Sequence, residues 1–182
     1  MKIWQLKSTF NGFETLGLLD FDRDHKIDDM LIQVTPIANN WKEVEICTIE
    51  EGKKSDCPHF WDWSIPVFSE RALYVTQHFL QDKAEALPLA HPERNFFAIH
   101  VTNAIDAIDY DRAVIKKLST GLRLVFEKYA FVKEKVEREN IFRVYLDESL
   151  VWMVFVSDAF KKVVESNNLS GLKFIEVWDS ES

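Results

Sequence analysis

Two segments of the chain share one pattern that limits what it can fold into. In each, an apolar run leads to a serine, an acidic residue and then apolar residues at helical spacing; the segments are 66–73 and 154–160. A serine at the N-cap and an acid in the first turn both stabilise the start of a helix. The pattern therefore predicts two main amphipathic helices, one after Ser69 and one after Ser157. Because this chemistry is common to helix starts, the repeat alone does not establish an internal duplication.

Strand-like runs surround both predicted helices. They are rich in β-branched and aromatic residues and lie at 3–6, 44–49, 84–89, 95–101, 141–146, 150–156 and 172–178. Residues 147–149 predict a three-residue hairpin loop. The stretch 112–132 fits a helix or a strand, and 11–40 predicts loops with short strands. The sequence thus predicts an α+β fold in a single domain over 1–182, with a mixed or mostly antiparallel sheet. Residues 1–52 are its least defined portion.

The charge of the chain restricts its partners. Its net charge at pH 7 is −8, whereas proteins that bind phosphate backbones present basic surfaces, so nucleic acid is not an expected partner. The charge is uneven, because the stretch 112–146 holds nine bases and four acids while the rest of the chain is acidic. Acidic stretches speed the encounter with a basic protein through electrostatic steering. A cationic protein is therefore the expected partner.

Several features predict a cytoplasmic protein. The two cysteines, Cys47 and Cys57, do not make a disulfide framework. The first residues lack the apolar stretch of a signal peptide. The longest apolar run, 150–156, is far shorter than the roughly 20 residues that cross a bilayer. We therefore expect no membrane partner.

The densest local pattern is a run of aspartates at 20–29. Oxygen-bearing side chains at alternating positions are typical of a calcium loop. However, His25 stands where such a loop has its glycine, and Leu31 stands where it has its closing glutamate. We therefore predict no metal site and interpret the run as a solvated acidic loop that docks a cationic partner. Its candidate partner-binding residues are Asp20, Asp22, Asp24, Asp28 and Asp29.

An aromatic patch lies between Pro58 and Pro66 and holds Phe60, Trp61 and Trp63. If this piece is extended, the two tryptophans share one face. They either cover an edge of the core or anchor an interface, where tryptophan is a frequent hot spot. We favour the core because two indole rings are costly to leave in water, and we keep both as candidate partner-binding residues.

Signals for catalysis are incomplete. Asp106 and Asp109 follow a predicted strand, where carboxylates serve as metal ligands or as acid and base, but aspartates also suit turns. Cys57 and His59 are separated by a proline, and such neighbours seldom face each other. The sequence has no glycine-rich phosphate loop, Gly-x-Ser-x-Gly elbow or His-Glu-x-x-His motif. We therefore predict that the chain is not an enzyme and that it uses no cofactor.

Four stretches together carry a family resemblance. They are Lys-Lys-Ser-Asp-Cys-Pro at 53–58, the segment 66–72 with the later Ala-Leu-Pro-Leu at 86–89, the stretch 98–109, and the ending formed by 154–160, 169–174 and 177–178. From about residue 53 onward the chain resembles the immunity protein 11 family of bacterial polymorphic toxin systems. The resemblance implies that the chain neutralises a cognate toxin by binding it, and it supplies no catalytic residues.

The favoured function is therefore inhibition of a basic protein toxin by direct binding. Acidic groups would steer and pair with the toxin, and exposed aromatic rings would anchor the contact. Two alternatives stay open at this point. One is an enzyme with a carboxylate or metal-assisted site around Asp106 and Asp109, and the other is an adaptor for a different protein.

Overall fold

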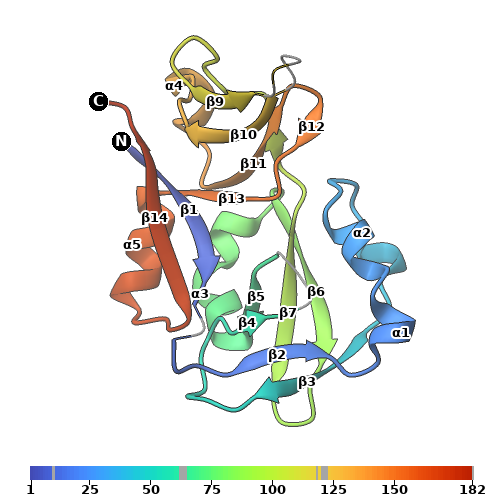
Figure 1. Ribbon diagram of the computed structural model, residues 1–182. Coiled ribbons are helices and arrows are strands. Elements are labelled where there is room, and N and C mark those ends of the chain that lie inside the picture. The colour runs from blue at the N-terminus through green and yellow to red at the C-terminus, as the bar shows by residue number, and fades with distance from the viewer. Residues whose placement is uncertain (10, 62–64, 118, 120–122, 182) are drawn as a thin grey trace.

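The computed structural model describes residues 1–9, 11–61, 65–117, 119 and 123–181 (Figure 1). The chain is 41% strand and 21% helix, so the expected α+β fold is weighted toward β. Its described strands form two larger mixed sheets and one separate two-stranded sheet. Within the described residues, no helix is long and apolar enough to cross a membrane.

The first sheet joins the two ends of the chain. Its main order is β12(Ser149–Leu150)-β11(Ile141–Leu146)-β13(Val154–Ser157)-β1(Lys2–Ser8)-β14(Leu172–Asp179), and β8(Ala104–Ile105) pairs in parallel with β11. The strands β13 and β14 are both antiparallel to β1, which lies between them. Figure 1 shows the two termini close together beyond β1 and β14.

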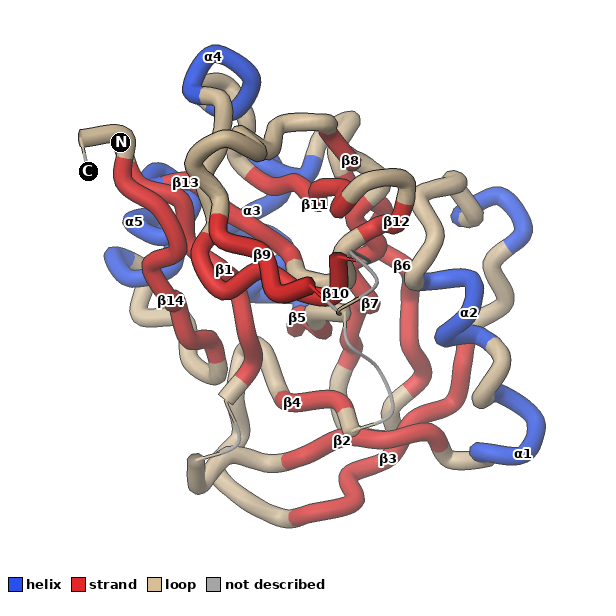
Figure 2. The backbone as a smooth tube through the Cα atoms, turned by 45° about the horizontal axis from the view of Figure 1, so that its top comes forward, coloured by secondary structure: helices blue, strands red, loops and turns tan. Residues whose placement is uncertain are grey.

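The second sheet is built mainly from the N-terminal half. Its order is β4(His59–Phe60)-β2(Thr15–Leu18)-β3(Val44–Glu50)-β6(Ala84–Ala90)-β7(Asn95–Val101)-β5(Val67–Ser69). The β2–β4 and β3–β6 pairs are parallel, and the remaining pairs are antiparallel. Figure 2 shows β2 and β3 at the far end of the molecule from α4(Lys133–Val136).

Two helices pack against each other, and each connects two strands of one sheet. They are α3(Glu70–Leu80) and α5(Asp158–Ser166), and their Phe79 and Phe160 rings lie 5.4 Å apart. Each helix connects two parallel strands that have one antiparallel strand between them, β7 in the first case and β1 in the second. The repeated sequence pattern thus corresponds to a repeated local topology. The two units differ in that β7 follows its unit along the chain whereas β1 precedes its own.

The serine caps predicted from the sequence are confirmed. Ser69 Oγ accepts a hydrogen bond from the Ala72 N–H at 3.3 Å, and Ser157 Oγ accepts one from the Phe160 N–H at 3.2 Å.

We expect Ser69→Ala and Ser157→Ala each to lower the free energy of unfolding by about 1 kcal/mol, because an amide at the helix start loses its acceptor. Chemical denaturation measures this loss. A variant that keeps its stability but loses its biological effect would contradict a purely structural role.

Two local predictions are settled differently by the structure. Within the ambiguous stretch 112–132, β9(Val114–Lys117) and β10(Arg123–Lys128) pair as antiparallel strands. Ile115 and Phe126 pack on the core, while Val114 and Val125 face solvent. The predicted three-residue loop at 147–149 is wrong. Ser149 pairs with Leu146, so the turn has two residues and Asp147 adopts a φ of 54°.

Candidate partner-binding face

The aspartate run at 20–29 is helical where a loop was expected. It forms α1(Phe21–Asp24) and α2(Ile27–Leu31). Asp20 caps α1, since its Oδ1 accepts a hydrogen bond from the Arg23 N–H at 3.1 Å. Acids in the first turn of both helices interact favourably with the helix start. The aspartate run, which we interpreted as a loop, is therefore equally compatible with two helix starts.

The five candidate aspartates differ in what they offer to a partner. Asp20, Asp22 and Asp29 are exposed and Asp28 is half-buried. Asp24 is only 8% exposed and forms a 2.6 Å ion pair with Arg23, which also reaches Glu45 at 3.2 Å. This pairing with Asp24, and secondarily with Glu45, raises the pKa of the Arg23 guanidinium. Asp24 therefore serves the internal structure, while the other four face outward in whole or in part.

Large apolar side chains lie among these acids. Leu19 is 59% exposed, Phe21 is 56% exposed and Met30 is 42% exposed. The Phe21 ring stacks on His25 with 5.4 Å between ring centroids. Figures 1 and 2 both place α1 and α2 on the opposite side of the molecule from α5. We call Leu19, Asp20, Phe21, Asp22, Asp29 and Met30 the α1–α2 face. The sequence interpretation of a solvated acidic loop named only the aspartates as partner-binding residues, so the apolar members of this face were not predicted.

Buried polar groups hold the chain that follows α2. Arg143 is 3% exposed, and its Nη1 donates to the Ile32 carbonyl at 2.8 Å. The buried ring of His100 donates from Nε2 to the Gln33 carbonyl at 2.9 Å. Burial lowers the pKa of Arg143 to about 10, so the side chain stays charged at neutral pH. These contacts fix the C-terminal end of α2 against strands of both sheets.

Glu85 fixes the next part of the same segment. Its carboxylate accepts hydrogen bonds from the Ile37 and Ala38 N–H groups at 2.7 and 3.0 Å, and it lies 3.0 Å from His100 Nδ1. Burial would raise the pKa of Glu85, but these donors lower it overall, so it is ionised at neutral pH. Leu31 is fully buried in the core beside the second sheet. The α1–α2 face is therefore presented from a firmly attached segment.

One described ring of the aromatic patch is buried and the other is exposed. Phe60 is 2% exposed and belongs to the core, but Trp61 is 67% exposed, so the expectation that it is buried is wrong. The Trp61 N–H donates to the Leu16 carbonyl at 2.8 Å, which continues the extended backbone of β4. Side chains alternate along an extended chain, so Trp61 faces away when Phe60 faces inward. Trp63 lies outside the described residues.

The groups considered for catalysis do not form a shared site. Asp109 Oδ1 accepts from the N–H groups of Asp111 and Arg112, as in a turn, and Asp106 is exposed beside Lys135. Burial raises the pKa of the Cys57 thiol well above its usual value, and His59 Nδ1 contacts Ser8 Oγ at 2.9 Å. Across the described ranges, no three His, Cys, Asp or Glu side chains come together as metal ligands would.

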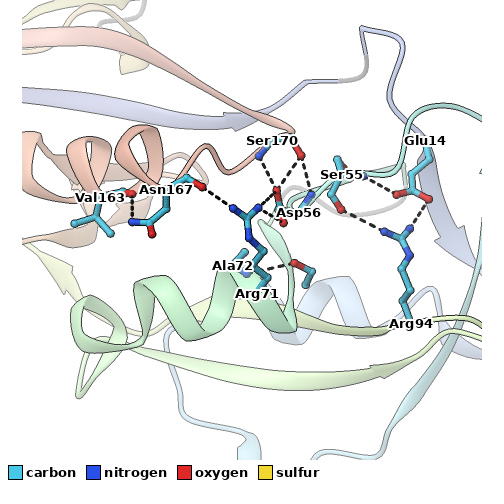
Figure 3. A network of polar contacts seen from close by, with 10 residues as sticks. Glu14, Ser55, Asp56, Arg71, Ala72, Arg94, Val163, Asn167 and Ser170 are labelled. Carbon is cyan, nitrogen blue, oxygen red and sulfur yellow. Dashed lines mark hydrogen bonds and ion pairs between the residues drawn. The ribbon is translucent and has the colours of Figure 1, made fainter.

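A polar network joins distant parts of the chain (Figure 3). Asp56 accepts from Arg71 at 2.9 Å and from the Ser170 N–H and hydroxyl groups at 2.9 and 3.0 Å. Arg71 also donates to the Asn167 carbonyl at 2.6 Å. Burial would raise the pKa of Asp56, but these hydrogen bonds lower it overall. Three of the stretches that carry the family resemblance, 53–58, 66–72 and 169–174, therefore meet in one place.

A second part of this network is a buried carboxylate. Glu14 is fully buried, and Arg94 Nη2 lies 2.5 Å from its Oε2. The Ser55 N–H donates to Glu14 Oε1 at 3.1 Å, and Lys54 lies 3.4 Å from Oε2. Gly171 closes the junction nearby with a φ of 91°, and a Cβ there would lie 2.3 Å from the Cys57 carbonyl oxygen. The stretches that carry the family resemblance thus connect parts of the fold that are far apart in the sequence.

The comparison with known protein families places the chain among immunity proteins. Residues 88–179, slightly more than half of the chain, match the model of the immunity protein family (Imm11), and the chain belongs to that family. No curated protein sequence matches the chain. The family membership confirms the resemblance seen in the sequence. The matched region includes Arg94, His100, Arg143 and Ser170, which all take part in the contacts described above.

Proposed function

We propose that this protein neutralises a cognate bacterial toxin domain by binding it directly, in the cytoplasm of the cell that it protects. Membership of the immunity protein family carries this proposal. Such a role needs a stable surface that complements the toxin, and it needs no catalytic group of its own. Carboxylates that are dispersed over separate turns suit a binding protein better than an enzyme.

The α1–α2 face is the surface that we assign to the toxin. It combines exposed apolar side chains, Leu19, Phe21 and Met30, with the exposed acids Asp20, Asp22 and Asp29. Apolar groups at the centre of a contact supply most of the affinity, whereas the surrounding charges set orientation and association rate. Because the acids exceed the bases on this face, the toxin surface that fits it is basic. The exposed Trp61 is a second candidate contact.

Salt should slow the association of the two proteins. Raising the ionic strength from about 0.01 M to about 0.15 M shortens the screening length from about 30 Å to about 8 Å, so steering by exposed aspartates weakens. We expect the association rate constant, measured by stopped-flow mixing with the toxin domain, to fall by about tenfold or more. An association rate that stays flat over this range would contradict electrostatic steering.

A pair of matched variants locates the charges responsible. In Asp20→Asn/Asp22→Asn/Asp29→Asn the face loses three charges, while asparagine at position 20 can still cap α1. The control Glu127→Gln/Glu134→Gln/Glu137→Gln removes three exposed acids from the β10–α4 region. Both variants have the same net charge. We expect the aspartate variant to associate more slowly and to depend less on salt, and the control to behave as wild type. Equal effects would mean that only net charge matters.

A further inference from the structure

A small groove lies directly beside the α1–α2 face. It has a volume of about 290 Å³ and is lined by Leu19, Glu45, Cys47, Ala90, His91 and Pro92. Its origin is the unequal length of two paired strands. β6 pairs with β3 only through Val44–Leu89 and Glu45–Ala90 and then turns away, whereas β3 continues to Glu50. The groove therefore occupies the notch where β3 extends beyond the end of β6.

The lining is apolar with a negative rim. Leu19 is 59% exposed, and Pro92 is also exposed. Glu45 supplies a half-exposed carboxylate at the edge, and Asp20 follows Leu19 directly. None of the lining residues is a lysine or an arginine. The edge already receives one guanidinium group, because Arg23 Nη1 and Nη2 both donate to Glu45 Oε2 at 3.2 Å.

The imidazole ring of His91, which lines the groove, is held in its neutral form. The Glu93 N–H donates to His91 Nδ1 at 3.2 Å, so this nitrogen carries no proton. His91 Nε2 then carries the proton and donates to Thr48 Oγ1 at 3.2 Å. Burial and the neighbouring Arg94 lower the pKa of His91, in agreement with this arrangement. A cation that enters the groove therefore meets no opposing charge from His91, and at the rim it shares the Glu45 carboxylate with Arg23.

We propose that this groove receives one lysine or arginine side chain of the toxin, and this inference rests on the proposed function. The aliphatic stem of such a side chain lies against Leu19 and Pro92, and its charged end reaches Glu45. The groove volume of about 290 Å³ accommodates one long side chain. Leu19 belongs to both surfaces, which makes the groove continuous with the α1–α2 face.

Cys47 makes the proposal testable in the unaltered protein. It is partly exposed in the groove, whereas Cys57 is 1% exposed, so a maleimide added to the folded chain reacts at Cys47. The experiment measures the rate of N-ethylmaleimide labelling at Cys47 by mass spectrometry, with and without the cognate toxin domain. We expect the toxin to slow labelling at least tenfold, because the inserted side chain covers the thiol.

The converse experiment labels Cys47 first and then measures the affinity for the same toxin domain. We expect the affinity to fall at least tenfold, while the chain carried through the same steps without the maleimide binds as before. Circular dichroism and the melting temperature verify that the labelled chain is folded. As a second test, Leu19→Lys should weaken binding, whereas Tyr74→Lys, an equivalent change at a 75% exposed position on α3, should not.

The outcomes separate the two proposals. If the toxin binds but neither protects Cys47 nor responds to the label, the groove is not a contact and the proposed function stands. If the unlabelled chain does not bind the toxin domain at all, the proposed function fails and this inference fails with it.

Discussion

Arg94→Met should lower the free energy of unfolding by about 3 kcal/mol at neutral pH. The change leaves Glu14 as a fully buried carboxylate without its closest cation, and breaking a buried ion pair from one side typically costs about 3–5 kcal/mol. The Ser55 N–H and Lys54 still contact Glu14, which places the expected loss at the lower end. Urea denaturation measures the effect.

The loss should also depend on pH in a defined direction. In the natural chain, burial would raise the pKa of Glu14, but Arg94 and the Ser55 N–H lower it overall. This carboxylate therefore stabilises the fold above its unfolded pKa, and that contribution is lost as the pH falls through the lowered value in the folded state. Without Arg94, burial dominates and the folded-state pKa rises, so Arg94→Met should be most damaging at neutral pH and least damaging in acid, where Glu14 is protonated in both states.

Lys54→Met is the matched control for this prediction. Lys54 contacts the same Glu14 oxygen at 3.4 Å, but its side chain is 47% exposed. Exposed ion pairs contribute about 0–1 kcal/mol, so the control should lose much less than Arg94→Met. Equal losses in the two variants, or a loss in Arg94→Met that does not change with pH, would contradict the assignment of Glu14 as a buried charge that depends on Arg94.

Phe155→Ala should cost about 3–5 kcal/mol, the usual loss for a large ring removed from a packed core. Phe155 is fully buried at the centre of an aromatic cluster. Its ring lies 5.0 Å from Tyr129, 5.6 Å from Phe131 and 5.8 Å from Phe142, measured between centroids. The substitution therefore leaves a cavity between β13, β11 and the chain that follows β10, and these elements cannot close over it without moving.

The control for this variant is Trp61→Ala. Trp61 is 67% exposed, so its removal creates no cavity, and the free energy of unfolding should change by no more than about 0.5 kcal/mol. Thermal and urea unfolding of both variants give the comparison. If Trp61→Ala destabilises the protein as much as Phe155→Ala, then Trp61 packs on the core and is not available to a partner.

The sequence predicted those helices and strands that depend on patterns within a few neighbouring residues. The serine caps at 69 and 157, and the strands over 84–90 and 95–101, follow from short-range spacing that the tertiary structure does not override. The acidic run shows the limit of this reasoning. Asp20 is equally good in a loop and at a helix start, and its neighbours in the sequence do not decide between them. The contacts that hold the end of α2 come from His100 and Arg143, which are distant in the sequence.

The candidate face could be predicted only in part for the same reason. Their closeness in the sequence identified the aspartates as candidates. It did not show that Asp24 is buried in an ion pair with Arg23, or that Leu19 and Phe21 face solvent. The groove was not predictable at all, because it depends on where β6 stops along β3, and that register is set by contacts between segments about 45 residues apart. Trp61 was misplaced because alternation indicates that neighbours face opposite ways without indicating which of them faces the core.

The central claim is that this chain inactivates a toxin by occupying its surface. The most direct test is to titrate a fixed amount of the toxin domain with the chain and to measure the remaining toxic activity at each ratio, at concentrations well above the dissociation constant. Direct binding predicts that activity falls in proportion to the added chain and ends at a fixed stoichiometric ratio. Loss of activity at catalytic amounts of the chain, or full activity in the presence of excess chain, would contradict it.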